Sequence, residues 1–139
     1  MKMDVSKVKT ISVKFRGAIE LCSQELGITF SRFPNGSCGD TKNLLGTFLI
    51  ENNLGEFNYI IGTNVNHTPG THAWLQQGDL VVDITADQFI NVRDKVIVSS
   101  SSGWHRSIEA KIMHVADYRV EESTFANYDE IYKKILEFI

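Results

Sequence analysis

The sequence predicts an α+β domain in which N-terminal helices pack against an antiparallel β-sheet. Two observations lead to this class. Apolar residues recur every three to four positions in the first part of the chain, whereas short segments rich in Val, Ile and aromatic residues follow in the second part. Helices that precede strands, rather than alternate with them, are typical of α+β folds. With 139 residues and neither a linker nor a repeat, residues 1–139 are expected to form one domain.

Two helices are predicted before the sheet. An apolar stripe marks the first, over 6–26, and Cys22 lies on that stripe, so it is expected to be a small buried core residue. A loop at 28–37, with Pro, Asn and Gly, separates it from the second helix. The second helix begins at Cys38 and ends near Asn52.

Five strands and a closing helix are predicted in the second half. Their residues are enriched in β-branched and aromatic types, and polar loops separate them. The strands are expected at 57–63, 71–76, 80–85, 95–99 and 110–120, and an amphipathic helix at 128–138.

Composition argues against several classes of protein. The net charge of −3, without a basic stripe, gives no reason to expect a nucleic-acid partner. The apolar runs are shorter than the ~20 residues that span a bilayer, so no membrane segment is expected. The N-terminus lacks the apolar core of a secretory signal, which predicts a cytoplasmic protein and leaves signal-independent export open. In a reducing compartment Cys22 and Cys38 are not expected to form a disulfide.

Cys38 is the candidate nucleophile. It stands in Asn-Gly-Ser-Cys-Gly-Asp, at the predicted start of the second helix. The N–H groups of a first helical turn and the positive end of the helix dipole stabilise a thiolate there. Gly36 and Gly39 keep the sulfur approachable. Taken alone, a cysteine in a turn is equally compatible with an inert side chain.

His72 and Asp83 are the candidate base and its orienting carboxylate. His72 shares a strand face with Trp74. A hairpin loop centred on Gln77-Gly78 would place His72 directly opposite Asp83, where Cβ atoms of an antiparallel pair are about 4.5–5.5 Å apart. A carboxylate at that distance is expected to accept a hydrogen bond from the imidazole Nδ1–H.

Two other carboxylates compete with Asp83 for this role. Asp79 belongs to the turn, and Asp87 lies beyond the strand. Asp83 is instead flanked by apolar residues within a strand, and a carboxylate in such a place requires a partner.

The order of these motifs resembles the transglutaminase-like branch of the papain-fold superfamily. The matching residues are Cys38, His72-Ala73-Trp74 and Asp83-Ile84-Thr85, and the similarity covers roughly 31–89. The resemblance implies a papain-like fold with the nucleophile at a helix N-terminus, a Cys-His-Asp triad, a thioester intermediate, and neither a metal nor another cofactor. The family includes peptidases, deamidases, crosslinking transferases and toxin domains, and also inactive relatives. A calcium loop is missing, which argues against a calcium-gated crosslinker.

The oxyanion of such a reaction needs hydrogen-bond donors. The backbone N–H of Cys38 is the natural first donor, and Asn35 and Gln88 are candidates for a second. Each of these two residues is also compatible with a plain turn or surface amide. Trp74 is expected either to form a wall of the cleft or to belong to the core.

The remaining histidines do not predict a metal centre. His67, His105 and His114 lie in separate segments without paired ligand spacing, so a site with His72 is not expected. The serine run at 99–102 lacks the pattern of a phosphate loop and predicts a solvated loop. Trp104 and His105, which follow that run, are further candidates for substrate contact.

The leading prediction is a cysteine-dependent amide hydrolase, of the peptidase or protein-glutamine deamidase type, acting on a peptide or protein substrate. Two alternatives stay open. One is acyl transfer, as in a transglutaminase or a toxin effector, and the other is a catalytically silent peptide-binding module of the same fold. The sequence contains no motif that specifies the substrate or the oligomeric state.

Overall fold

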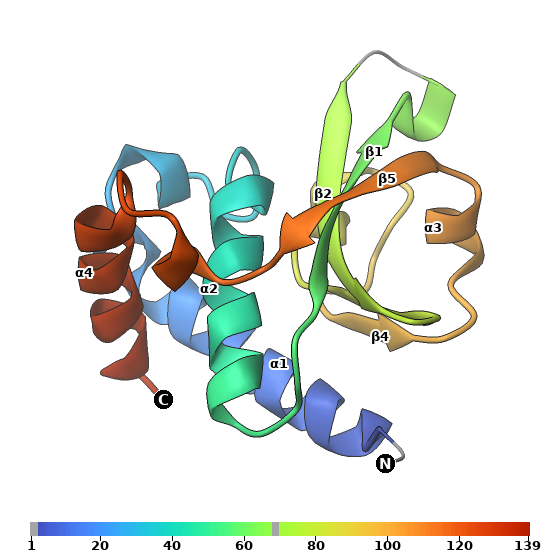
Figure 1. Ribbon diagram of the computed structural model, residues 1–139. Coiled ribbons are helices and arrows are strands. Elements are labelled where there is room, and N and C mark those ends of the chain that lie inside the picture. Colours follow the sequence, from blue (N-terminus) through green and yellow to red (C-terminus); the bar gives the residue numbers. More distant parts are fainter. Residues whose placement is uncertain (1–2, 68–69) are drawn as a thin grey trace.

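In the part of the chain that the structure describes, three helices gather beside a five-stranded antiparallel sheet, and a short fourth helix lies on the sheet's other side (Figure 1). The computed structural model describes residues 3–67 and 70–139. The helices are α1 (Val5–Cys22), α2 (Cys38–Glu51), α3 (Gly103–Arg106) and α4 (Phe125–Leu136). The strands are β1 (Asn58–Thr63), β2 (Thr71–Gln77), β3 (Leu80–Asp83), β4 (Ile97–Ser99) and β5 (Glu109–Val115).

The strand order in the sheet is β4-β3-β2-β1-β5, and every neighbouring pair is antiparallel. The predicted α+β class is therefore confirmed, with helices packed on an antiparallel sheet. Each expected strand has a counterpart. The last is shorter than expected, because the chain leaves the sheet after Val115 and forms a 3-10 turn at Tyr118–Val120.

Helix α1 buries the apolar stripe that predicts it. Asp4 caps its N-terminus by accepting a hydrogen bond from the Lys7 N–H at 3.0 Å. The α-helix ends at Cys22, which is buried in the core, and the expected last turn is a 3-10 turn at Ser23–Glu25. The pKa of the Cys22 thiol is raised, mainly because the side chain is buried. A raised pKa disfavours the reactive thiolate, so Cys22 is expected to be unreactive.

Helix α2 lies in the middle of the molecule, between the other long helices and the sheet (Figure 1). Gly46 permits this position, because a Cβ there would lie 2.1 Å from the Ala116 carbonyl oxygen. Helix α4 is tied to α2 by two tyrosine hydroxyls, which donate to Asp40 and Glu51. The helix that carries Cys38 is thus enclosed by packing along most of its length.

The hairpin between β2 and β3 corrects the predicted register. Gln77 pairs with Leu80 and Leu75 with Val82, so the loop is the two-residue turn Gly78-Asp79 rather than a loop centred on Gln77-Gly78. Gly78 has φ +58, which a tight hairpin requires and which glycine adopts without strain. The Gln77 side chain donates to the Glu56 carbonyl oxygen at 2.9 Å, which holds Gln77 in the strand.

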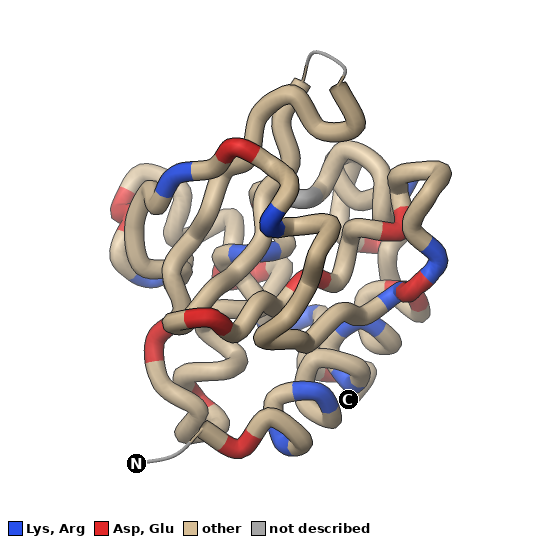
Figure 2. Tube along the Cα trace, turned by 90° about the vertical axis from the view of Figure 1, so that its right-hand side faces the viewer, with Lys and Arg blue, Asp and Glu red and all other residues tan. Residues whose placement is uncertain are grey.

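Acidic and basic positions are interspersed along the trace in the view of Figure 2. Among the described residues, no helix combines the length and the apolar character that crossing a bilayer requires.

Candidate active site

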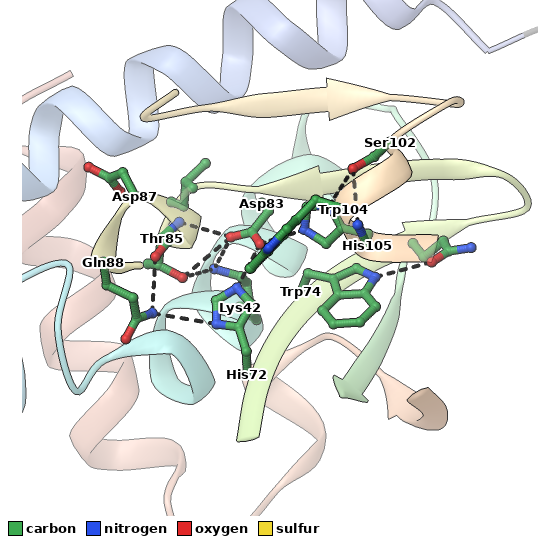
Figure 3. Close-up of polar contacts among 12 residues, drawn as sticks. Lys42, His72, Trp74, Asp83, Thr85, Asp87, Gln88, Ser102, Trp104 and His105 are labelled. Atoms are coloured by element: carbon green, nitrogen blue, oxygen red, sulfur yellow. Dashed lines mark hydrogen bonds and ion pairs between the residues drawn. The ribbon is translucent and has the colours of Figure 1, made fainter. Parts of the chain in front are cut away.

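His72 on β2 and Asp83 at the end of β3 form a buried pair (Figure 3). The distance from His72 Nε2 to Asp83 Oδ2 is 2.7 Å, and the residues are 1% and 0% exposed. The observed pairs end at Leu75 and Val82. Extending this register by one pair would place Asp83 opposite position 74 and make His72 its diagonal neighbour. Diagonal neighbours are about 7–8 Å apart, within reach of long side chains. The predicted contact is present, although the directly opposed geometry predicted for it is wrong.

The ring nitrogen that meets the carboxylate also differs from the prediction. Asp83 accepts from Nε2 of His72, not from Nδ1. This orientation turns Nδ1 to the other side of the ring, where it lies 3.4 Å from Nε2 of Gln88. Gln88 itself donates to the Thr85 carbonyl oxygen at 3.0 Å, within the turn after β3. With Nε2 engaged by the carboxylate, Nδ1 of His72 is the ring nitrogen that accepts from the Gln88 amide.

A buried lysine accompanies the carboxylate, and the sequence analysis missed it. Lys42 of α2 is fully buried, and its Nζ lies 2.7 Å from Thr85 Oγ1 and 3.4 Å from Asp83 Oδ1. The Thr85 N–H donates to the same Oδ1 at 2.9 Å. Burial is the largest influence on Asp83 and would raise its pKa, but the Lys42 ammonium and the His72 and His105 donors outweigh it. Together they hold the pKa of the Asp83 carboxyl well below its ordinary value.

His105 is the second unexpected member of the site. Helix α3 brings its Nε2 to 2.8 Å from Asp83 Oδ2, the same oxygen that contacts His72. On the other side of the ring, Nδ1 lies 2.5 Å from Oγ of Ser102. Ser102 is the N-cap of α3 and also accepts from the His105 backbone N–H. The Ser-x-x-His spacing at this helix start was a visible local signal, but nothing in the sequence connects it with Asp83.

His72, Asp83 and His105 bring three donor atoms within 4.8 Å of one another, a set that resembles a metal site. A meeting of His72 and His105 was not predicted, because they lie in separate segments of the sequence. Their contacts favour protons over a metal ion. Each imidazole Nε2 lies at hydrogen-bond distance from one oxygen, and the Lys42 ammonium shares the carboxylate, where it would repel a second cation.

Aromatic rings enclose both imidazoles. The His72 ring lies 5.0 Å from the Phe89 ring and 5.8 Å from the Trp104 ring, measured between centroids. The indole of Trp74 packs edge-on against His105 at 4.9 Å and is 2% exposed, so Trp74 belongs to the core on this face of the sheet. These rings keep water from the dyad, which strengthens its electrostatic interactions.

The other predicted site residues have different surroundings. Cys38 is the first residue of α2, and its side chain lies outside the part of the chain that the structure describes. Position 38 stands one helical turn before Lys42, so the two positions share a helix face. Asn35 lies in an exposed turn, where its N–H donates to the Arg32 carbonyl oxygen. Of the two candidates for a second oxyanion donor, Gln88 is the one that contacts His72.

The two rival carboxylates are accounted for elsewhere. Asp87 forms a two-pronged ion pair with Arg16, at 2.6 and 2.9 Å. Asp79 is exposed in the hairpin turn. Neither is a hydrogen-bond partner of His72 in the described structure, which leaves Asp83 as the carboxylate of this site.

Comparison of the chain with protein-family models, with curated proteins and with solved structures finds no match. The interpretation of the site therefore depends on its own geometry.

Proposed function

We propose that this protein is a thiol-dependent amide hydrolase in which Cys38, His72 and Asp83 form the catalytic triad. The observation that carries the proposal is the His72–Asp83 pair, with Nε2 bound to a buried carboxylate and Nδ1 directed away from it. An ionised carboxylate only accepts hydrogen bonds, so it selects the Nε2–H tautomer and leaves a lone pair on Nδ1. That tautomer is the form that a general base requires.

The position of Cys38 in the fold supports its role as nucleophile. Lys42, one turn further along the same face of α2, contacts Asp83, so this face of the helix adjoins the dyad. Cys38 also begins the helix, where N–H groups of the first turn stabilise a thiolate and a developing oxyanion. A papain-like arrangement, with the nucleophile on a helix and the base and its orienting carboxylate on neighbouring strands, agrees with these placements.

The proposed reaction proceeds in two steps. Nδ1 of His72 takes the thiol proton, and the sulfur of Cys38 attacks the carbonyl carbon of an amide. The tetrahedral intermediate collapses to a thioester, and His72 returns the proton to the departing amine. Water, deprotonated by His72, then attacks the thioester, which releases the acid and restores the thiol. Asp83 stabilises the imidazolium in both steps.

A hollow lined by Trp104, whose ring contacts His72, supports a peptide or protein as the substrate. It measures about 520 Å³. The amide side chains of Asn64, Asn66 and Asn91 line it, together with the fully exposed Ile90. Amides suit the polar groups of a peptide backbone, and Ile90 suits an apolar side chain.

A catalytically silent peptide-binding module is the second candidate. One observation favours it: the His72 side chain is buried, with Phe89 and Trp104 against its ring. In that case Cys38 would react like an ordinary thiol, because no base assists it.

Alkylation separates the two candidates. Iodoacetamide is added at pH 7, and the adducts on Cys38 and Cys22 are quantified by peptide mass spectrometry. The hydrolase proposal predicts rapid labelling of Cys38 that slows about tenfold or more in His72→Gln, since the thiolate loses its base. Cys22 is buried and should stay unlabelled, which reports that the fold is intact. Equal, slow labelling of Cys38 in wild type and His72→Gln would contradict the proposal.

A further inference from the structure

Two imidazole rings meet at one carboxylate oxygen in this site (Figure 3). Oδ2 of Asp83 lies 2.7 Å from Nε2 of His72 and 2.8 Å from Nε2 of His105. The triad proposed above uses only the first of these contacts. His105 is 3% exposed, and a buried polar group of this kind calls for a specific role.

The ionised carboxylate fixes the protons of both rings. Because Asp83 accepts at Oδ2 from each ring, each imidazole carries its proton on Nε2. In the His105 ring, Nδ1 then accepts from the Ser102 hydroxyl at 2.5 Å. Both nitrogens of His105 are thus engaged, one by the serine and one by the carboxylate, whereas Nδ1 of His72 is directed to Gln88.

Charged groups lie on several sides of His105. From α2, the Lys42 ammonium is within 3.4 Å of Asp83 and balances its charge. From β2, His72 shares the same oxygen. On the outer side, Asp79, Arg106 and Lys111 line a hollow next to His105, so charges of both signs face it there. Within the buried cluster the Lys42 ammonium and the Asp83 carboxylate balance each other.

His105 is also held firmly in place. Its ring packs edge-on against Trp74 at 4.9 Å and against Trp104 at 4.8 Å. Ser102 caps α3 and binds the ring of the same residue, so the short helix and the imidazole are oriented together. A donor fixed in this way restricts the rotation of the carboxylate that it contacts.

We propose that His105 is a positioning residue of the triad: its Nε2–H holds Oδ2 of Asp83 in the orientation that aligns His72 with Cys38. This role rests on the proposed hydrolase function. Ser102 contributes indirectly, because it fixes the tautomer and the rotation of the His105 ring. His105 itself does not touch the substrate in this account.

The test is the pH dependence of Cys38 alkylation by iodoacetamide in the full chain. In His105→Leu the donor is lost, and we expect alkylation at pH 7 to slow about tenfold, the value of a single buried hydrogen bond, with the profile moved to higher pH. In His105→Gln an amide N–H replaces Nε2–H, and the rate should return to within about threefold of wild type. If His105 only stabilised the fold, its replacement would not move the pH profile of Cys38 alkylation in a protein whose Cys22 stays unlabelled.

The outcomes distinguish this role from the function on which it rests. If wild-type Cys38 reacts like an ordinary thiol, both the hydrolase proposal and the role of His105 are overturned. If wild-type Cys38 is activated in a His72-dependent manner and His105→Leu keeps the wild-type profile, only the positioning role is overturned. If His105→Leu exposes Cys22 to labelling, Ser102→Ala is tested in place of His105→Leu. Slower alkylation of Cys38 in Ser102→Ala, by less than the tenfold expected for His105→Leu, supports the positioning role. An unchanged pH profile in Ser102→Ala contradicts that role.

Discussion

A partly buried ion pair, Arg16–Asp87, and a fully buried one, Lys42–Asp83, are built differently in this protein. Arg16 of α1 binds Asp87 through two parallel hydrogen bonds of 2.6 and 2.9 Å, one to each carboxylate oxygen. The same guanidinium donates to the Ile84 carbonyl oxygen at 2.6 Å. Two-pronged pairs of this kind use both oxygens and fix the geometry. The pair joins α1 to the segment after β3, and the guanidinium engages both oxygens of Asp87.

The Lys42–Asp83 pair divides the two oxygens of its carboxylate. Oδ1 receives the Thr85 N–H and faces the Lys42 ammonium, whereas Oδ2 is left to two imidazoles. An ammonium is a compact charge without the planar fork of arginine, so it balances the carboxylate without covering it. The cationic partner of a carboxylate therefore decides whether both of its oxygens are engaged or one is left to contact imidazoles.

Removing the cations should give the largest effect on stability. Lys42→Met is expected to lower the free energy of unfolding by about 3–5 kcal/mol, because a fully buried carboxylate loses its counter-charge. Arg16→Met should cost less, about 1–3 kcal/mol, since the Asp87 side chain is 15% exposed and can be hydrated. Urea unfolding measures both values. Lys133→Met, at a side chain that is 73% exposed, is the control and should change stability by no more than about 0.5 kcal/mol.

A double variant sharpens the same comparison. Lys42→Met/Asp83→Asn should be more stable than Lys42→Met alone, because it leaves no unpaired buried charge. A cost for Lys42→Met as small as that of Lys133→Met would contradict the account.

A smaller effect is expected in the acid range. The folded state holds the pKa of Asp83 well below its ordinary value, so the unfolded chain binds more protons there as the pH falls. The stabilisation is present above the ordinary pKa of aspartate, about 3.9, and is lost as the pH falls through the lower folded-state value. The free energy of unfolding should therefore decrease from about pH 5 downward, and this decrease should be shallower in Lys42→Met/Asp83→Asn.

The control for the acid range is Asp79→Asn, which removes an exposed carboxylate of the hairpin turn. Urea unfolding at a series of pH values should give it the slope of wild type. If Lys42→Met/Asp83→Asn kept the full wild-type dependence of the unfolding free energy on pH, Asp83 would not contribute to the loss of stability in acid.

Much of the fold was predictable because it depends on local periodicity. The apolar stripe of α1 and the β-branched segments of the strands are visible in any short window of the sequence. The register of β2 and β3 was not predictable, because Gln77-Gly78 and Gly78-Asp79 are both typical turn sequences. The positive φ of Gly78 and the hydrogen bond from Gln77 to Glu56 decide between them, and the latter joins distant residues.

The site was predictable only in part, for the same reason. His72 and Asp83 meet despite the wrong register, because a long side chain also reaches its diagonal neighbour. Lys42 gave no signal, since a lysine on a helix usually faces water and its burial follows from the packing of α2 on the sheet. His105 is 22 residues from Asp83 and arrives on a helix of four residues, in a stretch that resembles a loop.

The most direct test of the central claim compares the two carboxylates in one experiment. Asp83→Asn and Asp87→Asn are alkylated with iodoacetamide at pH 7 beside wild type, with unlabelled Cys22 as the criterion for a folded protein. We predict that Cys38 reacts about tenfold or more slowly in Asp83→Asn, because the base loses its orienting carboxylate, and within about twofold of wild type in Asp87→Asn. Wild-type reactivity of Cys38 in a folded Asp83→Asn would contradict the account.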